Sequence, residues 1–287
     1  KNIVIFSPNK IFNDYISDVL PELGEENMLQ TTFRDYAENL LPKGLVIEDM
    51  NDQMEFLLSK RGLPSFDKRL KSMKYKASVD FVQVIKNYTR YLENEGISFE
   101  DVYHKEDLII SKEEISKLLH TDYAYLPLLK RLEKIKQRIY FLMDPTEKEF
   151  SKEAEEEIAS SGDFIDAGEI KVRTMMATRE HFSGIREQIE RMTALELYQA
   201  YHRLFQDASL FVTIAKGTNL PEDLKTIMKY SYEKLSMRQL DYEDVAALLL
   251  MKSEFGGTPN MSDIKQVIID EAQDYTPVQY EIFRQLF

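Results

Sequence analysis

The strongest constraint on the fold lies near the end of the chain, where the β-branched run Val267-Ile268-Ile269 leads directly into Asp270-Glu271-Ala272-Gln273-Asp274. Three consecutive β-branched residues predict a short buried strand. Carboxylates that follow a strand of a parallel sheet lie at the edge where such sheets bind their ligands. The segment therefore predicts an α/β fold with an acidic site at the end of this strand. The alternative is an ordinary strand end with an acidic N-cap for a helix that begins near Thr276.

The opening residues show a second strand–turn–helix pattern. Asn2 to Phe6 predicts a buried strand, and Ser7-Pro8-Asn9 predicts the turn and the helix cap. Residues 11–20 predict an amphipathic helix that ends at Pro21 and Gly24. Both ends of the chain therefore supply a strand to the predicted α/β fold.

Three strings carry a resemblance to a known family: SPNKIFNDYISDVLPELGEE from Ser7, QTTF from Gln30 and VIIDEAQDYTPVQ from Val267. They are similar to motifs Ia, Ib and II of the UvrD/Rep-like superfamily 1 helicases, as the HelD / helicase IV-like branch writes them. QTTF by itself predicts a short strand. The segment from Asp241 to Met251 is similar to the DFxDL helix that precedes motif II. The likeness covers Ser7 to Phe33 and Asp241 to Phe287.

The resemblance implies an α/β RecA-like P-loop NTPase lobe with a partial parallel sheet and a mostly α-helical inserted domain. Residues 1–45 would form the first part of lobe 1A, residues 46–237 the insertion, and residues 238–287 the second part of the lobe. A P-loop requires G-x-x-x-x-G-K-[ST], and no Gly-Lys pair occurs in the sequence. We therefore expect a piece of a longer ATPase that begins shortly after the P-loop helix and is inactive alone.

The family assigns the acidic segment to ATP and Mg²⁺. Asp270 would hold Mg²⁺, mainly through water, and Glu271 would orient and deprotonate the water that attacks the γ-phosphate. Gln273 and Asp274 would belong to the nucleotide site and couple its state to neighbouring motifs. The residues expected to support them are Thr276 and Gln279. In this family ATP hydrolysis drives movement on nucleic acid or the release of RNA polymerase.

Motifs Ia and Ib of the family contact the sugar-phosphate backbone of single-stranded DNA or other nucleic acid. The matching residues in this chain are Ser7, Asn9, Thr31, Thr32 and Phe33. Hydroxyl, amide and aromatic groups suit this task because they contact phosphates, sugars and base faces without reading sequence. Pro8 departs from the family pattern, in which a hydroxyl-bearing or small residue is common at this position.

Two family meanings compete for the insertion. In translocating helicases it is a 1B-type domain against which duplex is split, and in HelD-like proteins it is a clamp arm that reaches into the main channel of RNA polymerase. The net charge of −13 favours the clamp arm, because a surface that displaces nucleic acid should be negative. The alternative function is accordingly a protein–protein binding module without unwinding activity.

Charge is unevenly distributed along the insertion. The segment from Lys60 to Lys76 holds seven basic residues and one acid, whereas Glu147 to Glu157 holds six glutamates and two lysines. Such runs are typical of the solvent-exposed side of helices. The alternative is a binding surface that separates a basic contact from an acidic one.

Several classes of site are excluded by composition. The chain has no cysteine, which excludes disulfides and thiolate metal sites. No apolar run approaches the roughly 18 residues of a membrane helix, so no membrane partner is expected. The resemblance implies the bacterial cytoplasm. A histidine metal cage is not expected, because ligand spacing is absent among His104, His120, His181 and His202.

The middle of the chain reads as helical. A wide apolar stripe predicts a helix from Ser78 to Asn94, and Ser111 and Thr193 each begin a capping box. Asp241 predicts the N-cap of an apolar helix with Gly256-Gly257 as its stop. The remaining predictions are helices from Tyr125 to Met143, from Glu169 to Met192 and from Pro221 to Leu235, and short strands at Asp107 to Ile110 and Leu210 to Ile214.

Overall fold

The computed structural model describes residues 2–9, 11–14, 28–161, 166–256, 258 and 263–287. This part of the chain is mostly helical and contains a small three-stranded parallel sheet. It divides into two compact units: unit 1 comprises Lys1–Leu92 with Glu196–Phe287, and unit 2 comprises Glu93–Leu195. Within the described residues, no helix is long and apolar enough to cross a bilayer.

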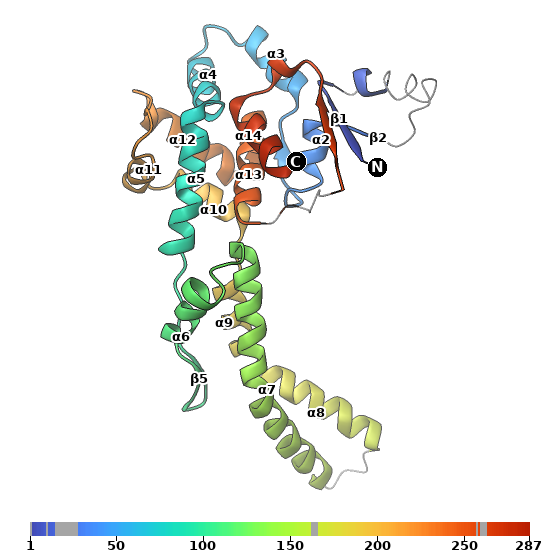
Figure 1. Cartoon of the computed structure of the whole chain (residues 1–287). Helices are drawn as coiled ribbons and strands as arrows, with labels where there is room; N and C mark the ends of the chain where they lie inside the picture. Colours follow the sequence, from blue (N-terminus) through green and yellow to red (C-terminus); the bar gives the residue numbers. More distant parts are fainter. Residues whose placement is uncertain (1, 10, 15–27, 162–165, 257, 259–262) are drawn as a thin grey trace. The chain divides into compact units, whose positions relative to one another are not determined.

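Unit 1 contains the parallel sheet, in the strand order β2-β1-β7. β1 (Ile3–Ser7) lies in the centre, with β2 (Met28–Thr32) on one side and β7 (Gln266–Ile269) on the other (Figure 1). Phe6 of β1 is in register with Ile269 of β7. The prediction of a parallel sheet that joins the opening strand to the strand before the acidic segment is confirmed.

The burial of β7 differs from the prediction. Its residues alternate between exposed and half-buried, and Ile268 is 38% exposed, whereas the residues from Val4 to Phe6 in β1 are buried. β1 has a neighbour on both sides, but among the described residues β7 pairs only with β1. An edge strand is covered less than a central one. The β-branched run therefore predicted the strand but not how deeply it is buried.

Helices make up most of unit 1. α13 (Tyr242–Glu254) lies at their centre, because every residue from Glu243 to Met251 is buried and α2, α4, α10 and α14 pack against it. A helix that is buried all round is a core helix. The other elements are α2 (Phe33–Glu38), α3 (Met50–Ser59), α4 (Pro64–Lys76), α5 (Val79–Asn94), α10 (Leu197–Leu204), α11 (Ala208–Ile214), α12 (Leu224–Ser236), the 3₁₀ turn η2 (Ala272–Asp274), α14 (Pro277–Leu286) and the short parallel pair β3 (Val46–Ile47) and β6 (Gln239–Leu240).

An aromatic cluster attaches the sheet to its helices. The ring of Phe6 lies 5.5 Å from that of Tyr36 in α2 and 4.6 Å from that of Phe283 in α14. Phe33, the first residue of α2, makes an edge-to-face contact with Phe283 at 5.7 Å. Such pairs add to the energy of burial and favour one ring orientation. The carboxyl end of β1 is therefore held against both α2 and α14.

Buried ion pairs attach α4 to α13. Lys76 Nζ lies 2.6 Å from Asp244 Oδ1, and neither side chain is exposed. Arg69 contacts the carboxylate of Glu243 and lies 2.6 Å from Glu48 Oε2. A buried charge needs a partner, because the interior cannot solvate it. Two of the seven cations of the Lys60 to Lys76 run are thus core residues and not part of a solvent-exposed face.

Unit 2 is built on one long helix. α7 (Leu128–Ser160) packs against α8 (Ala167–His181) and α9 (Ser183–Thr193). β4 (Val102–His104) and β5 (Asp107–Ile110) form an antiparallel hairpin, so the strand predicted at 107–110 is confirmed. The remaining elements are α6 (Lys112–Lys117), which carries the capping box predicted at Ser111, and the π-helical turn η1 (Leu118–Asp122).

Two local predictions in the middle of the chain are wrong. Leu210 to Ile214 is not a strand but part of α11, whose N-terminus is capped by Asp207 Oδ1, 2.8 Å from the Ser209 amide nitrogen. Thr193 does not begin a helix. It ends α9, and its hydroxyl donates to the Ile189 carbonyl at 2.7 Å. At the first site the Asp207 side chain caps a helix, and at the second the Thr193 hydroxyl bonds the carbonyl of the preceding helical turn.

Helix boundaries also differ from expectation. α7 begins at Leu128 and continues past Met143 to Ser160. The helix predicted from 169 to 192 is two helices, which meet at the fully buried Phe182. Residues 11–14 are helical, while the rest of the helix predicted to residue 20, its stops Pro21 and Gly24, and the stop at Gly257 lie outside the described residues.

The helical unit is shorter than the expected insertion. We expected residues 46–237 to form one inserted domain, but the compact unit between the two parts of unit 1 is Glu93–Leu195. Within the remainder, α4 and α10 pack against the core helix α13, and α12 packs against α4 and α10. The boundaries at residues 45 and 237 therefore do not coincide with those of the compact units.

Candidate functional site

The carboxyl ends of the three parallel strands meet at one edge of the sheet. Ser7 at the end of β1 is in register with Thr32 at the end of β2. The Asp270 amide donates to the Phe6 carbonyl at 3.0 Å, so Asp270 follows β7 at the same edge. This is the edge at which open α/β sheets bind ligands. Residues that are far apart in the sequence thus form one polar border.

A pocket of about 450 Å³ lies at this border and is lined by Ser7, Asn9, Thr32, Phe33 and Asp274. The structure therefore brings together four of the five predicted backbone-contact residues and one residue of the acidic segment. Thr31 does not line the pocket. Asp270, Glu271 and Gln273 do not line it either. A pocket of this size falls in the range of ligand sites in proteins.

The turn after β1 has the predicted geometry. Asn9 Oδ1 accepts a hydrogen bond from the Phe12 amide at 2.9 Å, as an N-cap should. The Ser7 side chain is 1% exposed, and no group in the described residues bonds its hydroxyl. A buried hydroxyl without a partner is costly. Ser7 is thus a free hydrogen-bonding group in the wall of the pocket.

The strand predicted from Gln30 to Phe33 is confirmed as far as Thr32, whereas Phe33 already belongs to the next helix. Thr32 is the N-cap of α2, with its Oγ1 accepting from the Asp35 amide at 3.1 Å. Phe33 belongs to α2 and is 3% exposed, so it forms part of the pocket wall from within the core instead of presenting an open aromatic face. Thr31 donates to the Thr32 carbonyl at 3.1 Å.

Several pocket residues carry no signal in the sequence motifs. Met50 and Met54 lie one turn apart on α3, are 41% and 49% exposed, and face the pocket, while no residue of α3 is buried. Their spacing reads as an ordinary core stripe. The other residues that line the pocket are Pro8, Ile11, Arg34, Asp49, Asn51, Tyr242 and Tyr275.

Strain is present where β7 ends. Glu271 has φ 47° and ψ 49°, the left-handed region, which costs a residue with a Cβ about 1 kcal/mol or more. Its carboxylate is exposed and accepts a hydrogen bond from the Gln273 side-chain amide. Strained residues of this kind cluster at functional sites. The sequence motif alone did not indicate the strain.

Asp270 offers a carboxylate oxygen to a ligand. The residue is half-buried, and its Oδ2 atom is buried without a hydrogen-bond partner among the described residues. No group of three or more potential metal ligands occurs in that part of the chain. Mg²⁺ commonly binds through one or two carboxylates, several waters and substrate phosphates. An unpartnered carboxylate oxygen is a ligand of the kind that such sites use.

Two histidines lie closer together than their sequence spacing indicated. In unit 2, the Nε2 atoms of His104 and His181 are 2.9 Å apart. Phe150 stacks on His181 at 4.0 Å, and Phe182 stacks on His104 at 5.0 Å. Burial lowers the pKa of His181, and the nearby His104 lowers it further by a smaller amount. The geometry is that of a hydrogen-bonded histidine pair in an aromatic setting.

No protein-family model matches the chain, and no curated protein matches it. The sheet edge at which β1 and the acidic turn after β7 meet is therefore the main guide to function.

Proposed function

We propose that the chain is part of a HelD-like, ATP-dependent superfamily 1 helicase or translocase-type ATPase, and that unit 1 is its RecA-like lobe 1A. One observation carries the proposal: β1 and β7 are adjacent and parallel, so the strand that leads into the motif Ia-like turn and the strand that leads into the acidic turn end at the same sheet edge. Hydrolysis of ATP would drive movement on nucleic acid or release of RNA polymerase.

The acidic turn supplies the hydrolytic chemistry in this proposal. Asp270 would hold Mg²⁺ through its unpartnered oxygen and through water. Glu271 would accept a proton from the attacking water, and Gln273 would orient the Glu271 carboxylate through the hydrogen bond between the two side chains. Bound MgATP supplies the phosphoryl group that the water attacks. Asp274 lines the neighbouring pocket, and in this proposal it would link the nucleotide residues to the strand-binding residues.

The pocket at the sheet edge supplies the strand contact. Ser7 offers a hydroxyl without an internal partner, and Asn9 and Thr32 add polar groups from two helix starts. Phe33 forms part of the wall from α2, whereas Thr31 of β2 precedes Thr32 and does not line the pocket. These groups can contact a sugar-phosphate backbone without discriminating between bases. Single-stranded nucleic acid is therefore the proposed ligand.

Replacing the proposed base in the full-length protein tests the ATPase assignment. Glu271→Gln should lower ATP turnover by about 10²- to 10⁴-fold while leaving binding of a fluorescent ATP analogue intact. Glu222→Gln removes an exposed carboxylate from the same unit and should change neither. Unchanged turnover in Glu271→Gln would refute the assignment of the base.

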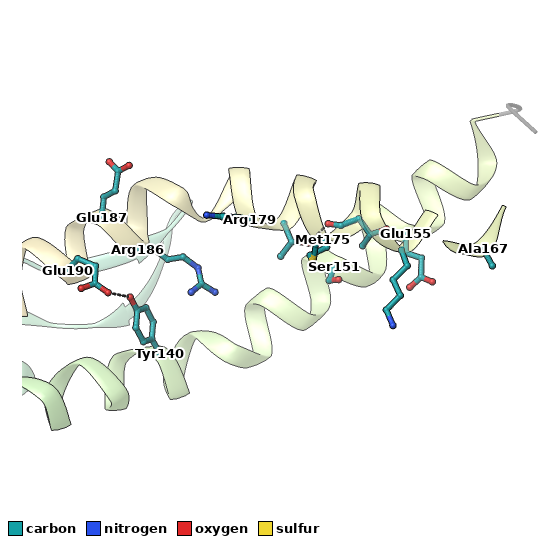
Figure 2. A pocket seen from close by; sticks show the side chains of 12 residues that line it. Tyr140, Ser151, Glu155, Ala167, Met175, Arg179, Arg186, Glu187 and Glu190 are labelled. Carbon is teal, nitrogen blue, oxygen red and sulfur yellow. Dashed lines mark hydrogen bonds between the residues drawn. The ribbon is translucent and has the colours of Figure 1, made fainter. Parts of the chain in front are cut away.

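A second candidate function is protein binding through unit 2. Its exposed large apolar residues include Phe141, Met175 and Met176, which are 68%, 64% and 63% exposed. Met175 also lines a pocket of about 1060 Å³ formed by α7, α8 and α9. Figure 2 shows this pocket, with Tyr140 of α7 hydrogen-bonded to Glu190 of α9. Exposed apolar side chains that border a pocket, as Met175 does, are found at interaction surfaces. The proposed partner, taken from the family resemblance, is RNA polymerase.

Capture of core RNA polymerase by the intact chain tests this second function. The double variant Met175→Ser, Met176→Ser should lose capture if unit 2 is the binding module, whereas Lys148→Gln on α7 should not. Retention of polymerase by the double variant would exclude these methionines from the interface. A chain that captures no polymerase but still binds single-stranded DNA would leave only the motor function.

A further inference from the structure

Two helices of unit 1 place lysines on a common surface. α4 and α12 pack side by side (Figure 1). We call their exposed lysines the lysine face; its members are Lys68, Lys71, Lys74, Lys225 and Lys229. On α4 these lysines recur every three residues, and on α12 they are four residues apart, spacings that put side chains on one side of a helix.

The buried cations of α4 determine which way this helix faces. Lys76 pairs with Asp244 inside unit 1, and Arg69 contacts Glu243 and Glu48. Both cations are neutralised by acids from other parts of the chain. Because they fix the rotation of α4, the remaining lysines of the helix are directed to solvent. The basic run in the sequence is thereby sorted into a neutralised inner set and a charged outer set.

The outer lysines converge on a small depression between the helices. Lys68, Lys225 and Lys229 line a pocket of about 250 Å³ together with Thr226, Tyr230 and Glu233. Within the described chain, no carboxylate lies within ion-pair distance of Lys68 or Lys225. Like charges that share a pocket repel one another unless an anion lies between them. The pocket is therefore suited to an anionic group that also accepts hydrogen bonds.

Acids reduce but do not cancel this charge. Asp223 pairs with Lys71 at 2.8 Å, and Glu233 approaches Lys229 at 3.9 Å. Asp67 is exposed on α4 itself. The exposed Glu222, which directly precedes Asp223, is a fourth carboxylate, so the five lysines leave a surplus of one positive charge in a chain whose net charge is −13. A polyanion would be repelled by the chain as a whole, so attraction requires a local surface of this kind.

We propose that the lysine face binds the phosphates of a nucleic acid backbone, at a surface that shares no lining residue with the pocket at the sheet edge. Lysine is a compact point charge that contacts phosphate oxygens without reading bases. Binding at this surface is accordingly independent of sequence and requires no ATP. The site extends the strand contact of unit 1 beyond the residues of the motifs.

Salt-dependent binding of a labelled single-stranded DNA to the full chain tests this surface. The triple variant Lys68→Gln, Lys225→Gln, Lys229→Gln should bind more weakly, and its plot of log affinity against log salt should be shallower by about 2, since each lost phosphate contact contributes about 0.7. When the salt concentration rises from about 50 to 200 mM, the triple variant should therefore lose roughly 20-fold less affinity than the unaltered chain. Circular dichroism verifies that the variant is folded.

The control carries the same change in net charge on unit 2. Lys130, Lys148 and Lys152 are 62%, 74% and 80% exposed, and their replacement by Gln should leave the slope unchanged. An equal effect in both triple variants, or none in the first, overturns the proposal. Loss of polyglutamate binding without loss of DNA binding also overturns it, because the surface would then serve an acidic protein. Glu271→Gln, which tests the ATPase, should retain the full slope.

Discussion

Replacing Lys76 by methionine is expected to destabilise unit 1 more than any exposed lysine substitution. Lys76 Nζ lies 2.6 Å from Asp244 Oδ1, with both side chains fully buried. The Tyr201 hydroxyl donates to the same oxygen at 2.6 Å, and the Lys76 ammonium lies 5.2 Å from the centre of the Phe205 ring. Methionine keeps most of the stem length but removes the charge. The Asp244 carboxylate then remains buried with the Tyr201 hydroxyl as its remaining side-chain partner.

The expected cost is about 3–5 kcal/mol, the usual loss when one partner of a buried ion pair is removed. A domain of this kind is stable by only about 5–15 kcal/mol, so the loss is a large fraction of the total. Adding Asp244→Asn to Lys76→Met should restore much of the stability, because the unpaired charge is removed while an oxygen remains to accept from the Tyr201 hydroxyl. The pair thus matters chiefly through the cost of leaving one member alone.

Urea denaturation followed by far-ultraviolet circular dichroism measures this loss, and the chain has no tryptophan to serve as a fluorescent probe. Lys71→Met is the matched control, because Lys71 and Asp223 form a pair at 2.8 Å in the same unit but are 46% and 45% exposed. An exposed pair is worth about 0–1 kcal/mol. A loss in Lys76→Met no larger than in Lys71→Met would refute the reasoning.

Three further outcomes are expected. Burial raises the pKa of Glu243 to about 7, although the nearby Arg69 lowers it. The folded state therefore binds this proton more tightly than the unfolded chain, so the free energy of unfolding should rise by at most about 1.4 kcal/mol per pH unit as the pH falls from above 7 towards 4.5. In pH-dependent denaturation, Glu243→Gln should remove this slope. Glu271→Gly should raise the free energy of unfolding by up to about 1 kcal/mol by relieving its positive φ, while abolishing ATP turnover of the full-length protein; a loss of stability would contradict the strain. Burial and His104 lower the pKa of His181, so the unfolded chain binds more protons than the folded one and unit 2 should lose stability as the pH falls below about 6.5. Hydrogen exchange of the α8 amides should become faster over this pH range, and His181→Gln should remove this pH dependence.

The parts of the site that lie next to their own strands were predictable. Asn9 caps the residues after β1, and Thr276 caps α14 with Gln279 in the capping box, because each cap depends on residues within one helical turn. The acidic segment follows its strand for the same reason. The roles of Thr32 and Phe33 were not predictable, since α2 begins directly after β2 and packing against Phe283 buries the ring.

Local patterns of β-branched residues, caps and carboxylates were enough to predict the strands at both ends of the chain, to expect them in one parallel sheet, and to predict the acidic turn after Ile269. Three features became visible only in the folded chain: which cations of the Lys60 to Lys76 run face inward, that Met50 and Met54 border the pocket, and that His104 meets His181. These outcomes depend on contacts between residues far apart in the chain. A side chain's surroundings, and hence its charge and exposure, follow from such contacts and not from its neighbours in sequence.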